Sequence, residues 1–379
     1  MLLVFALCLL LLYIPLPLWA RPLPWQWTLG GVCLVALVNA FVCWAGERAA
    51  TRKERSANPQ GGAGVFRYVR AGLVFFVLLD AVVLRWPLFI QYTIGRARWL
   101  VLVDDVILLL PVVVMAATAV FFRHRFEVGR DRVTLSPSRY VRLRMRVEIG
   151  PLLVSWLLIV GMSDLYELLT PDFAGSATLG ILFMLLLCAG IVLAGPVILT
   201  RVWKTTSLPE GPLRTRLEDL CGRQGLSCRD LLVWHTDRHV HNAAVVGFLP
   251  SLRYILISDA MAAHFTADEV EAVFAHELGH VRLHHVIYYI IFAISFLPVY
   301  ATVLDLLAWI GLATPLDSLL MLGVDASQAI VLIFFASAYW AGGFSYLSRR
   351  FEREADFYAA EAADTDAFIS ALEKLGHLG

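Results

Sequence analysis

Long apolar runs dominate this sequence and most constrain the fold that it can adopt. Crossing the hydrocarbon core of a bilayer takes about 20 mostly apolar residues in an α-helix. Of the 379 residues, 59% are hydrophobic and 16% are charged, whereas a soluble domain is about half apolar and a quarter charged. The sequence therefore predicts an integral membrane protein that is mainly a polytopic helix bundle. Eight runs are candidate spans: roughly 1–19, 28–46, 66–92, 99–122, 150–169, 177–203, 286–311 and 326–347.

The first of these runs has two interpretations, a signal peptide or a retained helix. It has no basic residues ahead of its apolar part, and "LPLWARPLP" is a poor small-residue cleavage site. We therefore expect a retained helix.

Basic residues are spread unevenly over alternate loops, and this bias predicts the orientation. Loops 47–64 and 123–149 carry twelve lysines and arginines, and the alternate loops carry three. The N-terminus is then outside, and the polar stretch 204–285 is cytoplasmic. The basic loops could also suggest nucleic-acid binding, but their juxtamembrane position and a net charge of zero favour topology. Because 28 arginines accompany three lysines, a GC-rich bacterial genome and hence the bacterial inner membrane are expected.

Several charged residues interrupt the apolar runs. Such residues usually face a bundle interior or a water-filled cavity. Pairing between helices is the simpler interpretation, and contact with a transported substrate is the other. The residues are Asp80, Arg85, Asp104, Asp105, Asp164, Glu167 and Asp305.

The stretch 204–285 alone has the pattern of a folded soluble region. "GPLRTRLEDLCGRQGL" predicts an amphipathic helix, and "DLLVWH", "NAAVVGF" and "RYILISDAM" predict three strands. The segment "TADEVEAVFAHELGHVRLHH" predicts a helix that Thr266 caps, with Glu269 completing a capping box. A helix, a small sheet and a second helix are therefore expected in that order.

The second predicted helix carries "HELGH". His276 and His280 are four residues apart, so both imidazoles lie on one face and can bind one zinc ion. Glu277 is placed to accept a proton from a zinc-activated water as general base. The alternative is a solvated helix face with two surface histidines. No C-x-x-C pair occurs among the six cysteines, so a thiolate zinc site is not indicated.

A third protein ligand must come from elsewhere, because no suitably spaced histidine follows His280. The segment "YLSRRFEREADFYAAEAA" offers Glu352 as a ligand and, four residues on, Asp356 to accept the free N–H of a ligand histidine. Ordinary surface carboxylates on a helix leaving the membrane are the alternative. Topology favours the metal site, since the two spans between His280 and Glu352 return the chain to the same side of the membrane.

These motifs together resemble the membrane zinc metallopeptidases typified by CAAX prenyl protease type 1 and the heat-shock protease HtpX. The resemblance covers about 213–375 and rests on "HELGH", two apolar spans, "SRRFEREADFYA" and the upstream "HNAAVVGF…RYILISDAM". It implies a small α+β, gluzincin-like domain with one zinc ion held by His276, His280 and Glu352. It also implies Glu277 as catalytic base and Asp356 in support. Substrate would bind by strand addition along an edge strand that includes Asn242 and Ala243.

Two features depart from that family. Many members continue to a His-Pro segment whose histidine is thought to stabilise the transition state, whereas this chain has only His377 beyond Glu352. The six N-terminal spans exceed the two of HtpX-like members and are closer to the prenyl protease. His284 follows on the same helical stripe as His280, and we expect no metal contact from it.

We therefore predict a zinc metalloendopeptidase that cuts membrane-associated or misfolded proteins, with the lipid bilayer as its second partner and no nucleic acid. A CAAX-type processing protease and, in a different class, a transporter or channel with a non-catalytic metal site are the alternatives. A degenerate protease is disfavoured because Glu277 is intact. The sequence leaves the oligomeric state open. The expected parts are a membrane domain 1–203, a cytoplasmic catalytic insert 204–285, two spans in 286–347 and a helix with the third ligand in 348–379.

Overall fold

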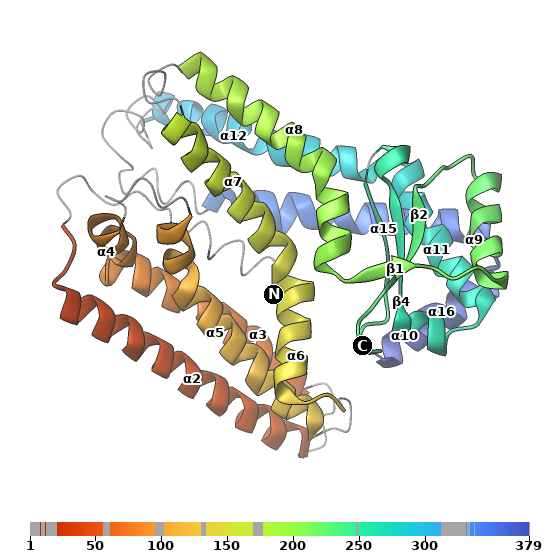
Figure 1. The fold of residues 1–379 in the computed structure, drawn as a ribbon, viewed down its shortest axis with the longest axis horizontal. Helices are drawn as coiled ribbons and strands as arrows, with labels where there is room; N and C mark the ends of the chain where they lie inside the picture. Colours follow the sequence, from red (N-terminus) through yellow and green to blue (C-terminus); the bar gives the residue numbers. More distant parts are fainter. Residues whose placement is uncertain are drawn as a thin grey trace. The chain divides into compact units, whose positions relative to one another are not determined.

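The computed structural model divides the chain into two compact units, Met1–Trp203 and Lys204–Gly379. The predicted mainly helical fold with one small sheet is confirmed (Figure 1). The residues described are 8, 12, 21–55, 61–94, 102–129, 134–169, 177–247, 249–311, 331, 334–336 and 338–378.

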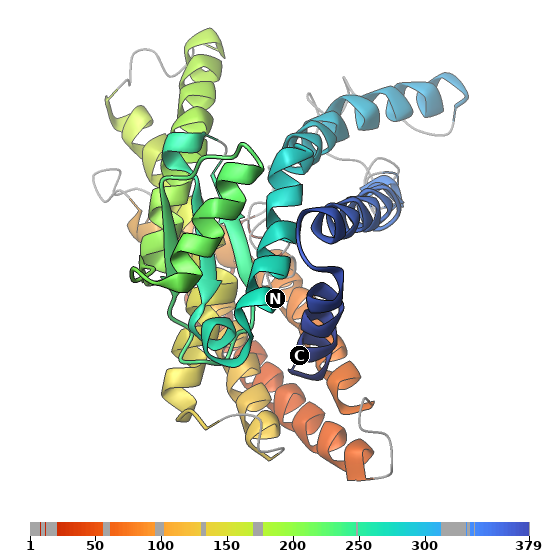
Figure 2. The same ribbon diagram turned by 90° about the vertical axis from the view of Figure 1, so that its right-hand side faces the viewer.

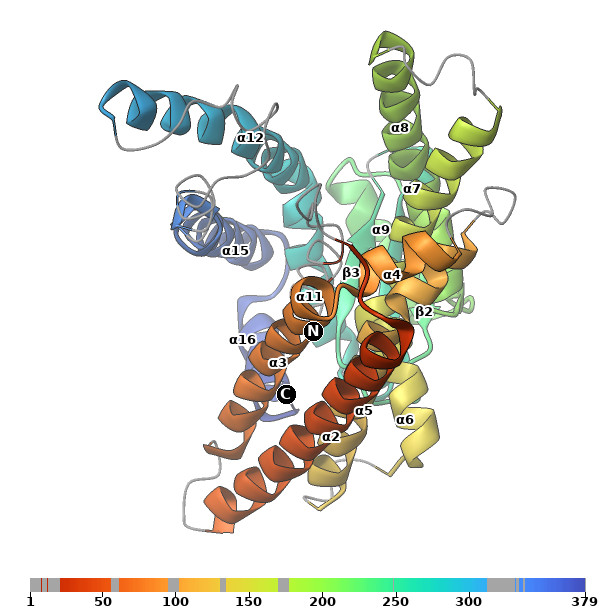
Figure 3. The ribbon, with the colours of Figure 1, turned by 90° about the vertical axis from the view of Figure 1, so that its left-hand side faces the viewer.

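The described residues of the first unit form helices joined by short turns, with no strand among them. Helices α2 and α3 pack on each other and on α5 (Figure 3). The helices are α2 (Trp25–Arg55), α3 (Gly61–Leu78), α4 (Trp86–Thr93), α5 (Val103–Val128), α6 (Pro137–Arg144), α7 (Gly150–Leu169) and α8 (Ala177–Val202), with π-helical segments η1 (Leu79–Val83) and η2 (Met145–Ile149).

Four helices over both units are long and apolar enough to cross a membrane, or six if each of two bent pairs counts as one span. The predicted spans 28–46, 99–122, 150–169 and 286–311 each overlap one of the four. Spans 66–92 and 177–203 overlap the two bent pairs. Runs 1–19 and 326–347 lie largely outside the described residues, so the total of eight spans stays a prediction.

Both bends have a local cause. The pair 178–191 and 193–202 bends by 47°, and Pro196 within α8 has no N–H to donate to the carbonyl of Val192. The pair 68–83 and 86–93 bends by 50°. There Arg85 adopts the left-handed region at φ 52° and Pro87 starts the next helix.

Polar groups within the first unit meet one another across helices. Asn39 on α2 donates to the Met115 carbonyl of α5 at 3.3 Å. Asp104 and Asp105 of α5 place carboxylate oxygens within 4.8 Å of one from Asp164 of α7. These three carboxylates carry charges of the same sign and form no ion pair with one another, so the predicted pairing of charged residues between helices stays a prediction.

The second unit contains a four-stranded sheet in the order β1-β2-β4-β3, in which β2 and β4 are parallel and the two edge strands are antiparallel to their neighbours. The strands are β1 (Thr205–Ser207), β2 (Asp230–Trp234), β3 (Ala243–Val246) and β4 (Tyr254–Ser258). The helices are α9 (Pro212–Arg223), α10 (Asp259–His264), α11 (Ala267–Arg282), α12 (His285–Trp309), α15 (Ser345–Ala362) and α16 (Thr365–Leu378), with the 3₁₀ turn η3 (Pro250–Leu252) and the π-helical segment η4 (Ala338–Phe344). The C label stands at the end of α16 in Figure 2.

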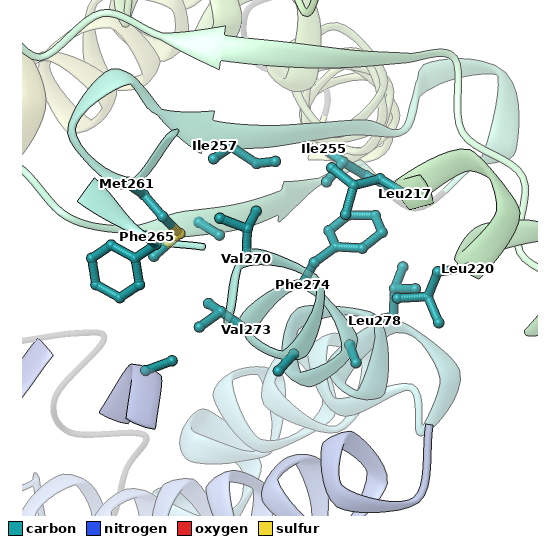
Figure 4. Close-up of a cluster of buried hydrophobic side chains, with 14 of the residues drawn as sticks. Leu217, Leu220, Ile255, Ile257, Met261, Phe265, Val270, Val273, Phe274 and Leu278 are labelled. Carbon is teal, nitrogen blue, oxygen red and sulfur yellow. The ribbon is translucent and has the colours of Figure 1, made fainter. Parts of the chain in front are cut away.

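Helix α11 packs one face on the sheet. Val270, Phe274 and Leu278 are spaced four residues apart: Val270 points toward Ile257, Phe274 toward Leu217 and Ile255, and Leu278 lies beside Leu220 (Figure 4). Phe274 and Leu278 are fully buried, and each such side chain contributes about 1.5–3 kcal/mol. This packing fixes the rotation of α11 about its axis.

The predicted elements of the second unit are confirmed. Helix α11 begins directly after Thr266, and the Thr266–Glu269 capping box is present. The predicted helix before the sheet is α9, and the three predicted strands are β2, β3 and β4. The three-residue β1 was not predicted, because its "TTS" sequence is polar and too short to show alternation.

Candidate metal centre

Two histidines of α11 present their side chains together. The Nε2 atoms of His276 and His280 are 3.3 Å apart, and both side chains are largely buried. They lie on the same face because α11 is regular across both residues. Val270, Phe274 and Leu278 pack in the core on one face of α11, so the two histidines lie on a different side of the helix.

Helix α15 brings a carboxylate to the same place. Glu352 Oε2 lies 3.4 Å from His276 Nε2 and 3.9 Å from His280 Nε2. A tetrahedral zinc ion with bonds of about 2.0–2.2 Å holds its ligand atoms about 3.3–3.6 Å apart. Two separations match this requirement and the third exceeds it by a few tenths of an ångström, so the three predicted ligands fit one zinc ion.

The close approach of α15 to α11 depends on Gly279. A Cβ atom at Gly279 would lie 3.2 Å from the Ala355 Cα and 3.2 Å from the Tyr358 side chain. The glycine of "HELGH" therefore lets the helix that carries Glu352 approach the histidines.

Each ligand histidine also has a neighbour at its other ring nitrogen. Asp356 Oδ1 lies 2.9 Å from His276 Nδ1, although the N–H does not point at the oxygen well enough for a hydrogen bond. His280 Nδ1 is hydrogen bonded to His285 Nδ1 at 2.9 Å. These neighbours leave both Nε2 atoms directed at the cluster.

Glu277 lies beside the cluster, toward the edge of the sheet. Burial, together with the negative charge of Glu352, raises the pKa of Glu277 to about 7, against an opposing hydrogen bond from the Val245 backbone. Burial and the neighbouring histidines lower the pKa of His280 to about 4. Near neutral pH the predicted base is therefore poised to exchange a proton, while His280 is neutral and able to bind a metal.

Strand β3 forms the edge of the sheet nearest α11. Asn242 directly precedes it and pairs with β4, since its carbonyl accepts from the Ser258 N–H at 3.0 Å. Backbone groups alternate in direction along a strand, so those of Ala243 and Val245 face the free edge. An extended peptide could pair with this edge beside Glu277.

A cavity of about 180 Å³ adjoins the cluster at the end of α11. Its wall includes His280 and His284, together with the basic Arg253 and Arg282. His284 has left the helical stripe, because α11 ends at Arg282 and His284 adopts φ 59°.

Sequence reasoning missed two residues at the site. His285 contacts His280, and the ring of Phe368 from α16 stacks on that of His276 at 5.9 Å. The only signal for His285 was a second histidine beside His284. Phe368 gave none, because its contact depends on how α16 folds back onto α11. His377, the only histidine that follows Glu352 in the sequence, lies in α16.

Comparison with known proteins agrees with this geometry. Residues 207–375 match the model of Peptidase family M48. A CAAX prenyl protease 1 homolog of Arabidopsis thaliana is 30% identical over 206 residues, which are 51% of this chain and 47% of the relative. A protease HtpX homolog of Aeropyrum pernix is 28% identical over 197 residues, which are 49% of this chain and 59% of the relative. The chain thus spans about half the length of these curated relatives.

A solved structure with similarity to this chain is the crystal structure of S. mikatae Ste24p. The two are 18% identical, with a TM-score of 0.45 and coverage of 93% of this chain and 92% of the other. The resemblance predicted from the sequence is confirmed by the family match to residues 207–375 and by the protease relatives.

Proposed function

From the Peptidase family M48 domain in residues 207–375, we propose that this protein is a zinc-dependent membrane endopeptidase that hydrolyses peptide bonds of membrane-associated or misfolded proteins. The observation that carries the proposal is the set of three donor atoms, from His276, His280 and Glu352, at separations of 3.3–3.9 Å beside the partly buried Glu277. Surface carboxylates and histidines without a shared role would not converge from two helices in this way.

The residues have distinct roles in this proposal. His276, His280 and Glu352 would hold the zinc ion. When bound, zinc would act as a Lewis acid that lowers the pKa of a water and polarises the peptide carbonyl. Glu277 accepts a proton from the attacking water and returns it to the leaving amine. Asp356, with its Oδ1 2.9 Å from His276 Nδ1, would accept the N–H of that ring once the two groups align.

The edge strand would align the substrate. A peptide that adds to β3 would pair with the outward backbone groups of Ala243 and with the Val245 carbonyl, because the Val245 N–H donates to Glu277. Asn242 lies at the start of the same edge. The cavity beside His280 could take one side chain of that peptide, and its arginines would favour an acidic one.

The membrane arrangement stays part of the proposal. Eight spans with the N-terminus outside would place the zinc site at the cytoplasmic face of a bacterial inner membrane. Processing of a prenylated C-terminal CAAX sequence is a second candidate, because relatives named CAAX prenyl protease 1 homolog match this chain at 30% and 33% identity.

The test is metal content and casein-type proteolysis of the detergent-purified protein beside Glu277→Gln. We expect one zinc per chain in both proteins and cleavage only by the wild type. The loss should be about 10²–10⁴-fold, as for a removed general base. A wild type that binds no zinc would refute the site and favour the transporter alternative. Equal cleavage by both proteins would refute the role of Glu277.

A further inference from the structure

His285 is a buried polar residue at the junction of two helices. It is the first residue of α12, and the left-handed conformation of His284 turns the chain between α11 and α12. Only 1% of His285 is exposed. Its ring stacks on Phe351 of α15 at 4.1 Å with an interplanar angle of 4°. The ring is therefore clamped in one orientation.

Both ring nitrogens of His285 are hydrogen bonded. Nδ1 lies 2.9 Å from His280 Nδ1, and Nε2 lies 3.2 Å from Glu354 Oε2. The second carboxylate oxygen of Glu354 accepts from Arg350 Nε at 2.8 Å. His285, Glu354 and Arg350 thus form a series of hydrogen-bonded side chains that runs from His280 to the surface of α15.

The donor and acceptor properties of these side chains decide which group donates in each hydrogen bond. The ionised Glu354 carboxylate only accepts, so His285 carries its proton on Nε2. His285 Nδ1 then has a lone pair and accepts from the Nδ1–H of His280. Because a neutral imidazole carries one proton, His280 Nε2 keeps its lone pair for a metal. This assignment of protons satisfies both hydrogen bonds of His285 and leaves His280 Nε2 free to bind a metal.

We propose that His285 and Glu354 are positioning residues that hold His280 in its metal-binding tautomer and orientation. The inference rests on the proposed function, since it takes the cluster to bind zinc. These hydrogen bonds also tie His280 to α12, which overlaps the first of the two predicted spans, and to α15, which follows the second. His276 has a looser support, a carboxylate contact without a well-aligned hydrogen bond.

The experiment measures zinc retention rather than turnover. His285→Phe keeps the stack on Phe351 but can neither accept from His280 nor donate to Glu354. Glu354→Leu removes the acceptor, whereas Glu354→Gln keeps one. His284→Asn is the matched control, because residue 284 is exposed and asparagine tolerates a positive φ. Zinc transfer to a chelator and the absorption spectrum of the Co²⁺-substituted protein are recorded for each purified full-length variant.

We expect His285→Phe and Glu354→Leu to weaken zinc affinity about 10–100-fold and to alter the Co²⁺ spectrum. Glu354→Gln should recover most of the affinity, and His284→Asn should match the wild type. Wild-type zinc retention and an unchanged Co²⁺ spectrum in both His285→Phe and Glu354→Leu would overturn the inference and leave the zinc site intact. Absence of zinc from the wild type would overturn the proposed function itself. If His285→Phe does not fold, Glu354→Leu decides alone, since that side chain is 35% exposed.

Discussion

At the scale of single residues, burial shifts the pKa values of Glu277 and His280 in opposite directions. Burial disfavours the charged form of each, so the pKa of the glutamate rises to about 7 and that of the histidine falls to about 4. The proposed general base, with a pKa near neutrality, and the proposed ligand histidine, which is neutral, therefore lie on adjacent turns of α11.

The pH dependence of activity should follow Glu277. A base works only when ionised, so kcat/KM should fall as pH decreases. The midpoint should lie between the ordinary value of 4.5 and about 7, because a bound cation favours the carboxylate. Steady-state cleavage of a fluorogenic peptide between pH 4.5 and 8.5 measures it. A flat profile over this range would contradict the assignment.

At the scale of elements, prediction succeeded where the pattern is local. The Thr266–Glu269 capping box is a property of one helix, and α11 begins where it predicts. The contact of His285 with His280 needs a left-handed turn and the stacking of Phe351, and neither is visible in a linear pattern. The bend at Pro196 was likewise hidden in a continuous apolar run.

The spacing of α11 and α15 should control zinc affinity through Gly279. Gly279→Ala places a methyl group 3.2 Å from Ala355 and Tyr358, so α15 must move by a few tenths of an ångström. We expect a loss of about 1–3 kcal/mol in stability from overpacking and zinc binding weakened about tenfold. Competition with a chelator measures the affinity. Gly222→Ala on α9, where a Cβ meets nothing within 4 Å, is the control. Unchanged zinc affinity in Gly279→Ala would show that the close approach does not position Glu352.

Glu269 joins α11 to α16. Burial would raise its pKa, but hydrogen bonds from Lys374, Ser370 and the Thr266 backbone, with the charge of Lys374, lower it to about 2. The folded state therefore favours the ionised form. Its contribution to stability is complete above about pH 4.5 and is lost as the pH falls towards 2.

Glu269→Gln should accordingly lower the free energy of unfolding by about 1.5–3 kcal/mol at pH 7. The difference in melting temperature from the wild type should shrink below about pH 4.5. Glu373→Gln, an exposed change on α16, is the control. A difference that does not vary with pH would mean that the ionised Glu269 is not the stabilising form.

At the scale of the whole molecule, the zinc ligands demand an even number of crossings between His280 and Glu352. Helix α12 is long and apolar enough to supply one crossing, and the run 326–347 is predicted to supply the other. The arginine-rich loops then predict that this side is the cytoplasm.

Cysteine labelling tests that orientation. In a background without native cysteines, a membrane-impermeant maleimide should label Ser176→Cys in intact cells, because loop 170–176 is predicted outside. Ser251→Cys, at an exposed position of the second unit, should be labelled only after the membrane is disrupted. The reverse pattern would place the metal site on the outer face.

The π-helical segment η4 directly precedes α15, which carries Glu352. A π-helical stretch accommodates an extra residue within a helix, and each residue of an α-helix turns the chain by about 100°. The extra residue therefore sets the rotation of α15 about its axis. Removing it would turn Glu352 about a quarter-turn away from the histidines, although all three ligand residues would still be present. Deletion of a single codon in the segment just before α15 could therefore abolish the metal site. A sequence alignment of related proteins should therefore compare the number of residues in the segment before α15 as well as the identity of the ligand residues.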